Sequence, residues 1–141
     1  MANNPFFSDA TIIADVNAVT ALLATGFLEI WSGAQPGDAN QALTGTKLAK
    51  LALSATAFIT PAVASGTTGS RLVTATANAI TTSAALATGT AGYFALLKAD
   101  DSTVVAMGSV GTSSADLNLN TLSLVSGVNV GVSAFTITQV E

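Results

Sequence analysis

The stretch TAGYFALLKADDSTVVAMGSV, residues 90–110, decides the fold of this chain. In its first half Phe94 and Leu96 fall on one side of an extended segment and Tyr93 on the other, which is the period of a β-strand. The letters ADDS at 99–102 are typical of a turn, because Asp and Ser side chains bond back to their own backbone. A second strand follows at once, so the stretch predicts a β-hairpin.

Outward from the hairpin, the chain alternates between short apolar segments and segments rich in turn residues. Strands are expected at 27–32, 46–53, 58–59, 72–76, 79–81, 117–119, 122–124, 128–132 and 135–137. Loops are expected at 32–45, 61–71, 83–89 and 111–115. Pro61 should end the strand before it. The alternation slips by one residue between Val132 and Phe135, which predicts a β-bulge near Ser133 and Ala134.

One helix is predicted, from about residue 10 to residue 24. Ser8 or Asp9 can cap its start with a side-chain oxygen, and Gly26 follows where a left-handed residue is wanted. One apolar stripe, widened by two neighbours, marks the face expected to be buried. Its members are Ile12, Val16, Val19 and Leu23, and the neighbours are Ile13 and Leu22.

These elements predict a mainly β fold, an antiparallel β-sandwich or a jelly-roll-like partial barrel, with the N-terminal helix over one edge or face. Residues 1–8, MANNPFFS, are expected to form an extended arm, because Pro5 disfavours helix entry and the two phenylalanines lie outside any periodic pattern. Residues 9–141 are expected to form a single β-rich domain, since 141 residues suit one domain.

Composition excludes some classes of protein and favours another. Half of the residues are hydrophobic but only 9% are charged, against about a quarter in an average protein. The best membrane-span candidate, residues 12–31, contains Asp15 and Glu29, so no membrane span is expected. The first basic residue is Lys47, which argues against a secretory signal peptide. A surface with few charges favours close packing of copies in an assembly.

Several kinds of chemistry lack the residues that they need. The chain has no Cys and no His, which excludes disulfides, Cys/His zinc sites, Cys nucleophiles and Ser–His catalysis. Four cations at a net charge of −4 cannot form a phosphate-tracking stripe, so nucleic-acid binding is not expected. The glycine-rich phosphate motifs and the GxSxG elbow are missing as well. No enzyme activity, cofactor, small-molecule substrate or metal ion is expected.

The carboxylates are the remaining candidates for chemistry. Asp100 and Asp101 could hold a calcium ion, but the dense oxygen spacing of a calcium loop is missing, which favours a turn. Asp38 and Asp116 could pair as general acid and base, although loop aspartates more often form Asx turns. A hydrolase would have to work with carboxylates alone.

Four aromatic residues are candidates for contacts between subunits. Phe6 and Phe7 lie in the arm, where they can pack on the domain's own core or dock on a neighbouring subunit. Trp31 and Tyr93 lie on the strand faces opposite the expected core. They are expected to be covered by a loop or a neighbour, with a sugar-stacking platform as the alternative.

Two long segments carry a resemblance to a known family. They are FLEIWSGAQPGDANQALTGTKLAKLALS at 27–54 and AGYFALLKADDSTVVAMGSVGTSSADLNLNTLSLVSGVNVGVSAFTIT at 91–138. The motifs are L-x-I-aromatic-S-G-x-Q-P, F-x-L-x-K-x-D, GSVGTS-x-ADLNLNT and a Val-rich final strand, and the helix at 10–24 also corresponds. The chain resembles small virion-associated proteins of tailed bacteriophages and prophages, from which the arm at 1–8 departs.

The resemblance implies a capsid decoration, or cement, protein that binds the major capsid protein and copies of itself, as a dimer or trimer. It implies a location on the capsid exterior after synthesis in the bacterial host cytoplasm. It brings no catalytic residue. A tail, neck or baseplate component and a carbohydrate-binding sandwich remain as alternatives.

Overall fold

The computed structural model describes residues 5–65, 71–132 and 134–140, and its fold is mainly β. The helix α1 (Asp9–Ala21) comes first, and strands follow to the end of the chain. The strands are β1 (Phe27–Ser32), β2 (Lys47–Ala52), β3 (Phe58–Ser65), β4 (Leu72–Ala77), β5 (Ser83–Ala84), β6 (Gly89–Leu97), β7 (Val104–Gly111), β8 (Leu117–Asn118), β9 (Ser123–Leu124), β10 (Asn129–Val130) and β11 (Thr136–Val140).

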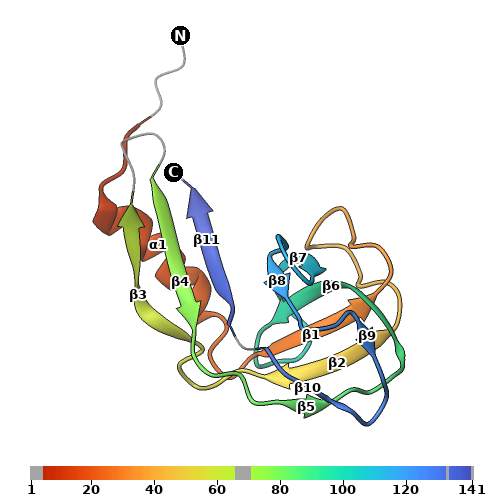
Figure 1. Cartoon of the computed structure of the whole chain (residues 1–141). Coiled ribbons are helices and arrows are strands. Elements are labelled where there is room, and N and C mark those ends of the chain that lie inside the picture. The colour runs from red at the N-terminus through yellow and green to blue at the C-terminus, as the bar shows by residue number, and fades with distance from the viewer. Residues whose placement is uncertain (1–4, 66–70, 133, 141) are drawn as a thin grey trace.

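The largest sheet curls into a half-barrel (Figure 1). Its strand order is β2-β1-β6-β7-β8, and β9 pairs with the start of β6. All of these pairs are antiparallel except β7 with β8. The pair β10 and β5 lies along the bottom of the half-barrel in Figure 1. The prediction of a mainly β fold with one N-terminal helix is therefore confirmed, in its partial-barrel form.

A second, three-stranded sheet stands beside the half-barrel, with the order β11-β4-β3 (Figure 1). The helix α1 packs against β3 and β4. Its buried Ile12 and Val16 meet a strand face that includes the buried Val73 and Ala75. The opposite face of this sheet has no helix over it in the described part of the chain.

The helix begins as predicted and ends differently. The Ser8 side chain accepts a hydrogen bond from the Thr11 backbone N–H, which confirms Ser8 as the N-cap. At the other end Thr25, not Gly26, takes the left-handed conformation, with φ of 55°. Gly26 is needed for space, because a Cβ there would overlap the carbonyl oxygen of Leu97. Leu22, expected on the apolar stripe, is exposed.

The predicted hairpin is confirmed as β6 and β7. Asp100 shapes its turn, because one carboxylate oxygen accepts hydrogen bonds from the backbone N–H groups of Ser102, at 3.0 Å, and Thr103, at 2.8 Å. Asp101 takes the left-handed conformation with φ of 59°, which Asp tolerates better than most residues. The turn predicted from the letters ADDS is therefore confirmed.

The loop prediction for residues 61–71 is wrong over 61–65, where β3 continues through Pro61. This is possible because β3 is an edge strand and its pairing with β4 is irregular between Ile59 and Val63. A proline without an N–H is tolerated in such a place. Residues 66–70 lie outside the described part. The strand expected at 79–81 is absent, and β5 falls inside the loop expected at 83–89.

The bulge prediction near Ser133 and Ala134 is replaced by a change of sheet. Val130 ends β10, which pairs with β5, whereas Thr136 begins β11, which pairs with β4. The slip in alternation therefore marks the crossing of the chain between two sheets. Ser133 itself lies outside the described residues.

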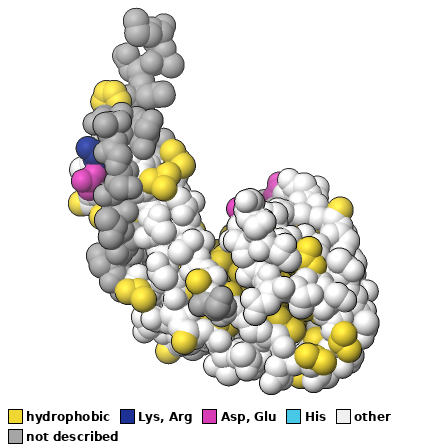
Figure 2. Space-filling model, in the orientation of Figure 1, with side chains coloured by type: hydrophobic (Ala, Val, Ile, Leu, Met, Phe, Trp, Pro, Cys, Tyr) yellow, Lys and Arg dark blue, Asp and Glu magenta, His cyan; other side chains and the backbone are white. Residues whose placement is uncertain are grey.

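One apolar core connects the two sheets. Phe135 sits at the junction, with its ring 5.3 Å from that of Phe94 in the half-barrel and 6.0 Å from that of Phe58 in β3. Above this junction a notch separates the sheets, and Figure 2 shows apolar side chains at its floor. A hollow of about 170 Å³ there is lined by Phe94, Leu96, Phe135 and parts of β7 and β11.

Candidate functional site

Trp31 and Tyr93 lie on neighbouring strands of the half-barrel, a pairing that the sequence did not predict. They are register partners on β1 and β6, and their rings stack with centroids 6.5 Å apart and planes 18° apart. Tyr93 is completely buried, whereas Trp31 is half-buried. The pair is therefore mainly an internal contact.

The loop between β1 and β2 covers Tyr93. The Tyr93 hydroxyl donates a hydrogen bond to the Thr44 carbonyl oxygen at 2.7 Å and accepts one from the Thr44 N–H at 2.9 Å. The prediction that a loop covers the Tyr93 ring is therefore confirmed. Tyr93 consequently presents no face to a sugar or a neighbouring subunit, and Trp31 alone of the pair remains accessible.

Glu29 is a buried carboxylate whose environment the sequence did not reveal. Its side chain is 0% exposed in β1. One oxygen forms an ion pair with the Lys47 ammonium, and the other accepts a hydrogen bond from the Trp31 indole N–H at 3.0 Å. The signal available in the sequence was the spacing of Glu29 and Trp31 on one strand face. The pairing with Lys47 depends on the register of β1 and β2, which no local pattern gives.

Two other basic side chains also form ion pairs with carboxylates. Lys50 pairs with Asp101 across the half-barrel and lies 4.0 Å above the ring of Phe27. Arg71 pairs with Asp9 at the start of the helix. Three of the four cations of the chain are thus neutralised by the fold itself.

The loop carboxylates have structural partners. Hydrogen bonds from Thr103, and secondarily from Ser102, lower the pKa of Asp100 from 3.8 to about 2. The backbone N–H and hydroxyl of Ser109 lower the pKa of Asp116 in the same way. Asp38 accepts a hydrogen bond from the Asn40 N–H at 2.8 Å, which is an Asx turn. All three carboxylates are engaged locally, and the lowered pKa values of Asp100 and Asp116 do not favour a general acid.

The described residues assemble no cluster of metal-ligating side chains. Within residues 5–65, 71–132 and 134–140, no group of three or more metal-ligating side chains lies close enough together to hold an ion. Over the same residues, α1 falls short of the length and apolar character that a membrane-crossing helix requires.

The arm presents one strongly exposed aromatic side chain. Residues 5–8 precede α1 without helix or strand, and Phe6 is 75% exposed. Phe7 is 51% exposed and has contacts within the structure. Phe6 is therefore the candidate contact residue whose ring is most open to a neighbour, while docking itself stays a prediction.

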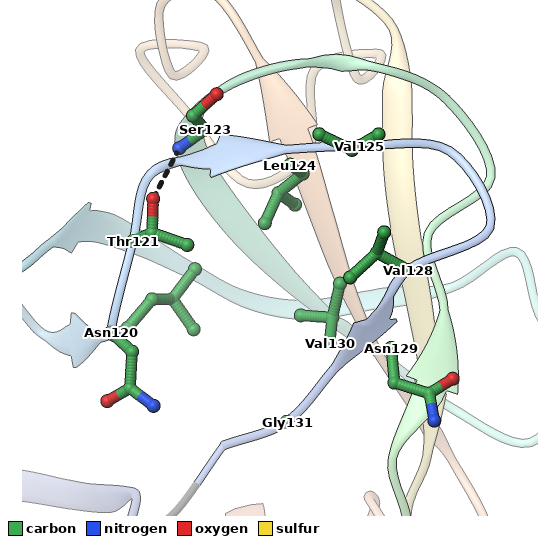
Figure 3. Close-up of a pocket in the computed structure, with 10 residues that line it drawn as sticks. Asn120, Thr121, Ser123, Leu124, Val125, Val128, Asn129, Val130 and Gly131 are labelled. Atoms are coloured by element: carbon green, nitrogen blue, oxygen red, sulfur yellow. Dashed lines mark hydrogen bonds between the residues drawn. The ribbon is translucent and has the colours of Figure 1, made fainter.

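A hollow of about 230 Å³ lies at the end of the half-barrel, and sequence reasoning did not find it (Figure 3). Leu124, Val128 and Val130 point toward one another in its lining. The polar side chains of the lining are all uncharged: Asn120, Thr121, Ser123 and Asn129. A hollow without charge suits a small apolar group and offers no means of acid–base catalysis.

No protein-family model, curated protein or solved structure matches this chain. The class that the fold and surfaces define is a small, mainly β protein whose described residues form internal ion pairs, an uncharged hollow and exposed apolar positions.

Proposed function

We propose that this chain is a bacteriophage virion protein that decorates the capsid and stabilises it by binding the lattice of the major capsid protein. The observation that carries the proposal is the resemblance of residues 27–54 and 91–138 to small virion-associated phage proteins. Those segments contain β1, β2, the β6–β7 hairpin and most of the later strands. They therefore supply the half-barrel and part of the three-stranded sheet.

The surface chemistry supports a role in close packing. With three of the four cations paired internally, few charges are left to resist contact with a neighbouring protein. Figure 2 accordingly shows a face of mostly neutral and apolar side chains. Exposed apolar residues such as Phe6, Val128 and Val140 offer contact positions.

A cement protein acts by mass action. It binds the assembled shell and not the separated subunits, so binding stabilises the shell. Repetition around the head adds avidity to an interface that is small in each copy. The proposed partners are the major capsid protein and further copies of this chain, on the exterior of the head, after synthesis in the host cytoplasm. The role needs no cofactor, nucleic acid, membrane or small-molecule substrate.

Heads assembled with and without this protein test the proposal. Decorated heads should withstand heating and internal DNA pressure better than bare heads, and adding the purified protein back should restore that resistance. Equal resistance of the two kinds of head would remove the cement role. Copy number per head, measured on the same particles, should match a lattice of binding sites.

The same composition would serve a tail, neck or baseplate component. Labelling the protein in whole virions separates this alternative from decoration, because label on the tail alone is incompatible with a head protein. A carbohydrate-binding role depends on Trp31, since Tyr93 is buried. A glycan screen without a binder, or binding unchanged in Trp31→Ala, would remove that alternative.

A further inference from the structure

The outer edge of β11 is an unpaired strand edge. β11 pairs with β4 on one side only, and no strand in the described residues pairs with its other side. It borders the notch, which is open to solvent in Figure 2. Such an edge presents backbone donors and acceptors that another strand can bind.

The hydrogen-bonding pattern identifies which residues face outward. The Ala77 N–H donates to the Phe135 carbonyl oxygen at 2.8 Å, so Phe135 points its backbone groups toward β4. In an antiparallel pair the direction alternates along the strand. The N–H and C=O groups of Thr136, Thr138 and Val140 therefore point away from β4, toward the open edge.

Two of the other edges are blocked against pairing. On β3, Pro61 and the irregular register interrupt the row of donors. On β2, the Leu86 N–H already donates to the Leu48 carbonyl oxygen, and Lys47 and Lys50 place charges along the strand.

The edge of β7 is occupied at its far end. The Asp116 carboxylate accepts the Ser109 N–H, and β8 pairs with Val110 and Gly111. β11, with the sequence TITQV, has neither a charge, nor a proline, nor a covering segment among the described residues. Proteins usually protect such an edge, so an unprotected one indicates a partner.

We propose that β11 pairs with β11 of a second copy of this chain, antiparallel, about a twofold axis at Thr138. A twofold axis at Thr138 places that residue opposite its own copy, so a charge at the axis would face its own kind. β11 is uncharged, which makes self-pairing free of that repulsion. An edge with a lysine at the axis would not be free of this repulsion, and β2 carries Lys47 and Lys50.

The pairing joins the two three-stranded sheets into one continuous sheet. Thr138 lies opposite its own copy and exchanges both backbone hydrogen bonds with it, while Thr136 lies opposite Val140 of the second copy. The open faces also become continuous. The exposed Leu72 and Val140 of each copy, which lie on that face, then pack near the axis. The inference is independent of the decoration proposal, because a monomer could also bind a capsid.

Disulfide trapping tests the geometry. The chain contains no cysteine, so Thr138→Cys introduces a single thiol in each copy. Directly opposed residues of a hydrogen-bonded antiparallel pair have Cα atoms about 5.5 Å apart, which a disulfide can span. Mild oxidation should convert Thr138→Cys to a covalent dimer. The control Thr76→Cys, on the same face but one strand away from the edge, should stay largely monomeric.

Sedimentation velocity tests the energetics without a crosslink. The unmodified chain should form a concentration-dependent dimer, and Thr138→Lys should weaken it several-fold because two lysines then meet at the axis. Gln139→Lys adds the same charge on the opposite face and should leave most of the dimer. A monomeric unmodified chain, no crosslink through Thr138→Cys, or equal dimerisation of the two lysine variants would each overturn the proposal.

Discussion

At the scale of single residues, the Tyr93 hydroxyl holds the longest described loop in place. Replacing it in Tyr93→Phe leaves the ring but removes the partner of both Thr44 backbone groups. We expect the free energy of unfolding to fall by about 1–3 kcal/mol. Denaturant titration measures this. The control Thr44→Ala keeps those backbone bonds and should change stability much less, so an equal loss in both variants would contradict the assignment.

Asp100 makes the hairpin turn sensitive to acid. Its pKa is lowered from 3.8 to about 2 in the folded chain, so the ionised carboxylate favours folding. That contribution is present above the ordinary pKa and is lost as the pH falls toward 2. Asp100→Asn should therefore show a smaller loss of stability between these pH values than the unmodified chain does. Urea midpoints measured across that range check it, and parallel pH curves for the two proteins would exclude this role.

Phe6 is expected to matter for association and not for folding. Its ring is largely exposed, so Phe6→Ala should change the free energy of unfolding by no more than about 0.5 kcal/mol. If the arm docks on a neighbour in the particle, the same variant should bind heads more weakly. Thermal unfolding and co-sedimentation with heads measure the two effects. Undiminished binding would show that the arm is not a contact, while the decoration proposal would stand.

Residue patterns predicted the neighbours of a side chain only where those neighbours are close in sequence. The turn role of Asp100 follows from the letters ADDS, since its partners are the next residues. The burial of Tyr93 depends on Thr44, which is 49 positions away. The ion pair of Glu29 with Lys47 likewise depends on strand register. Such contacts are set by tertiary structure, which single-sequence periodicity does not contain.

At the scale of elements, the end of α1 divides two roles between neighbouring residues, whereas the sequence predicted only a left-handed backbone at Gly26. Thr25 has the left-handed backbone, and Gly26 has the close neighbour. Thr25→Gly should stabilise the chain by roughly 0.5–1 kcal/mol, because glycine adopts positive φ without strain. Gly26→Ala should destabilise it by about 1–3 kcal/mol through overlap with Leu97. Thermal melts of both variants check the pair, and the opposite order of stability would refute it.

Elements were predictable where local pattern and fold agree. The helix, β1 and the β6–β7 hairpin carry clear periodicities and caps, and all were found near their expected bounds. The prediction ended β3 too early, because Pro61 usually breaks a strand. In the structure β3 continues through Pro61, since it is an edge strand with an irregular register. The segment before β11 was interpreted as a bulge because alternation cannot distinguish a bulge from a crossing between sheets.

At the scale of the whole molecule, Phe135 couples the two sheets. Its ring contacts Phe94 and Phe58, which belong to different sheets. Phe135→Ala should lower the free energy of unfolding by about 3–5 kcal/mol and weaken the cooperativity between the sheets. Fluorescence of the single Trp31 reports on the half-barrel, and far-ultraviolet circular dichroism reports on α1 together with the strands of both sheets. The two transitions should coincide in the unmodified chain and separate in the variant. Coincident transitions in both would contradict the coupling.

The placement of the four cations also determines where and how fast trypsin can cleave this protein. Trypsin cleaves after Lys and Arg, and here Lys47 and Lys50 lie within β2 while Arg71 and Lys98 adjoin the ends of strands. A strand must leave its sheet before a protease can hold it, so digestion of the folded chain should be slow. Even the unfolded chain yields few fragments, because it contains only four Lys and Arg residues. In the test of the decoration proposal, trypsin alone would therefore under-report this protein, and a protease that cuts at apolar residues would count it more faithfully.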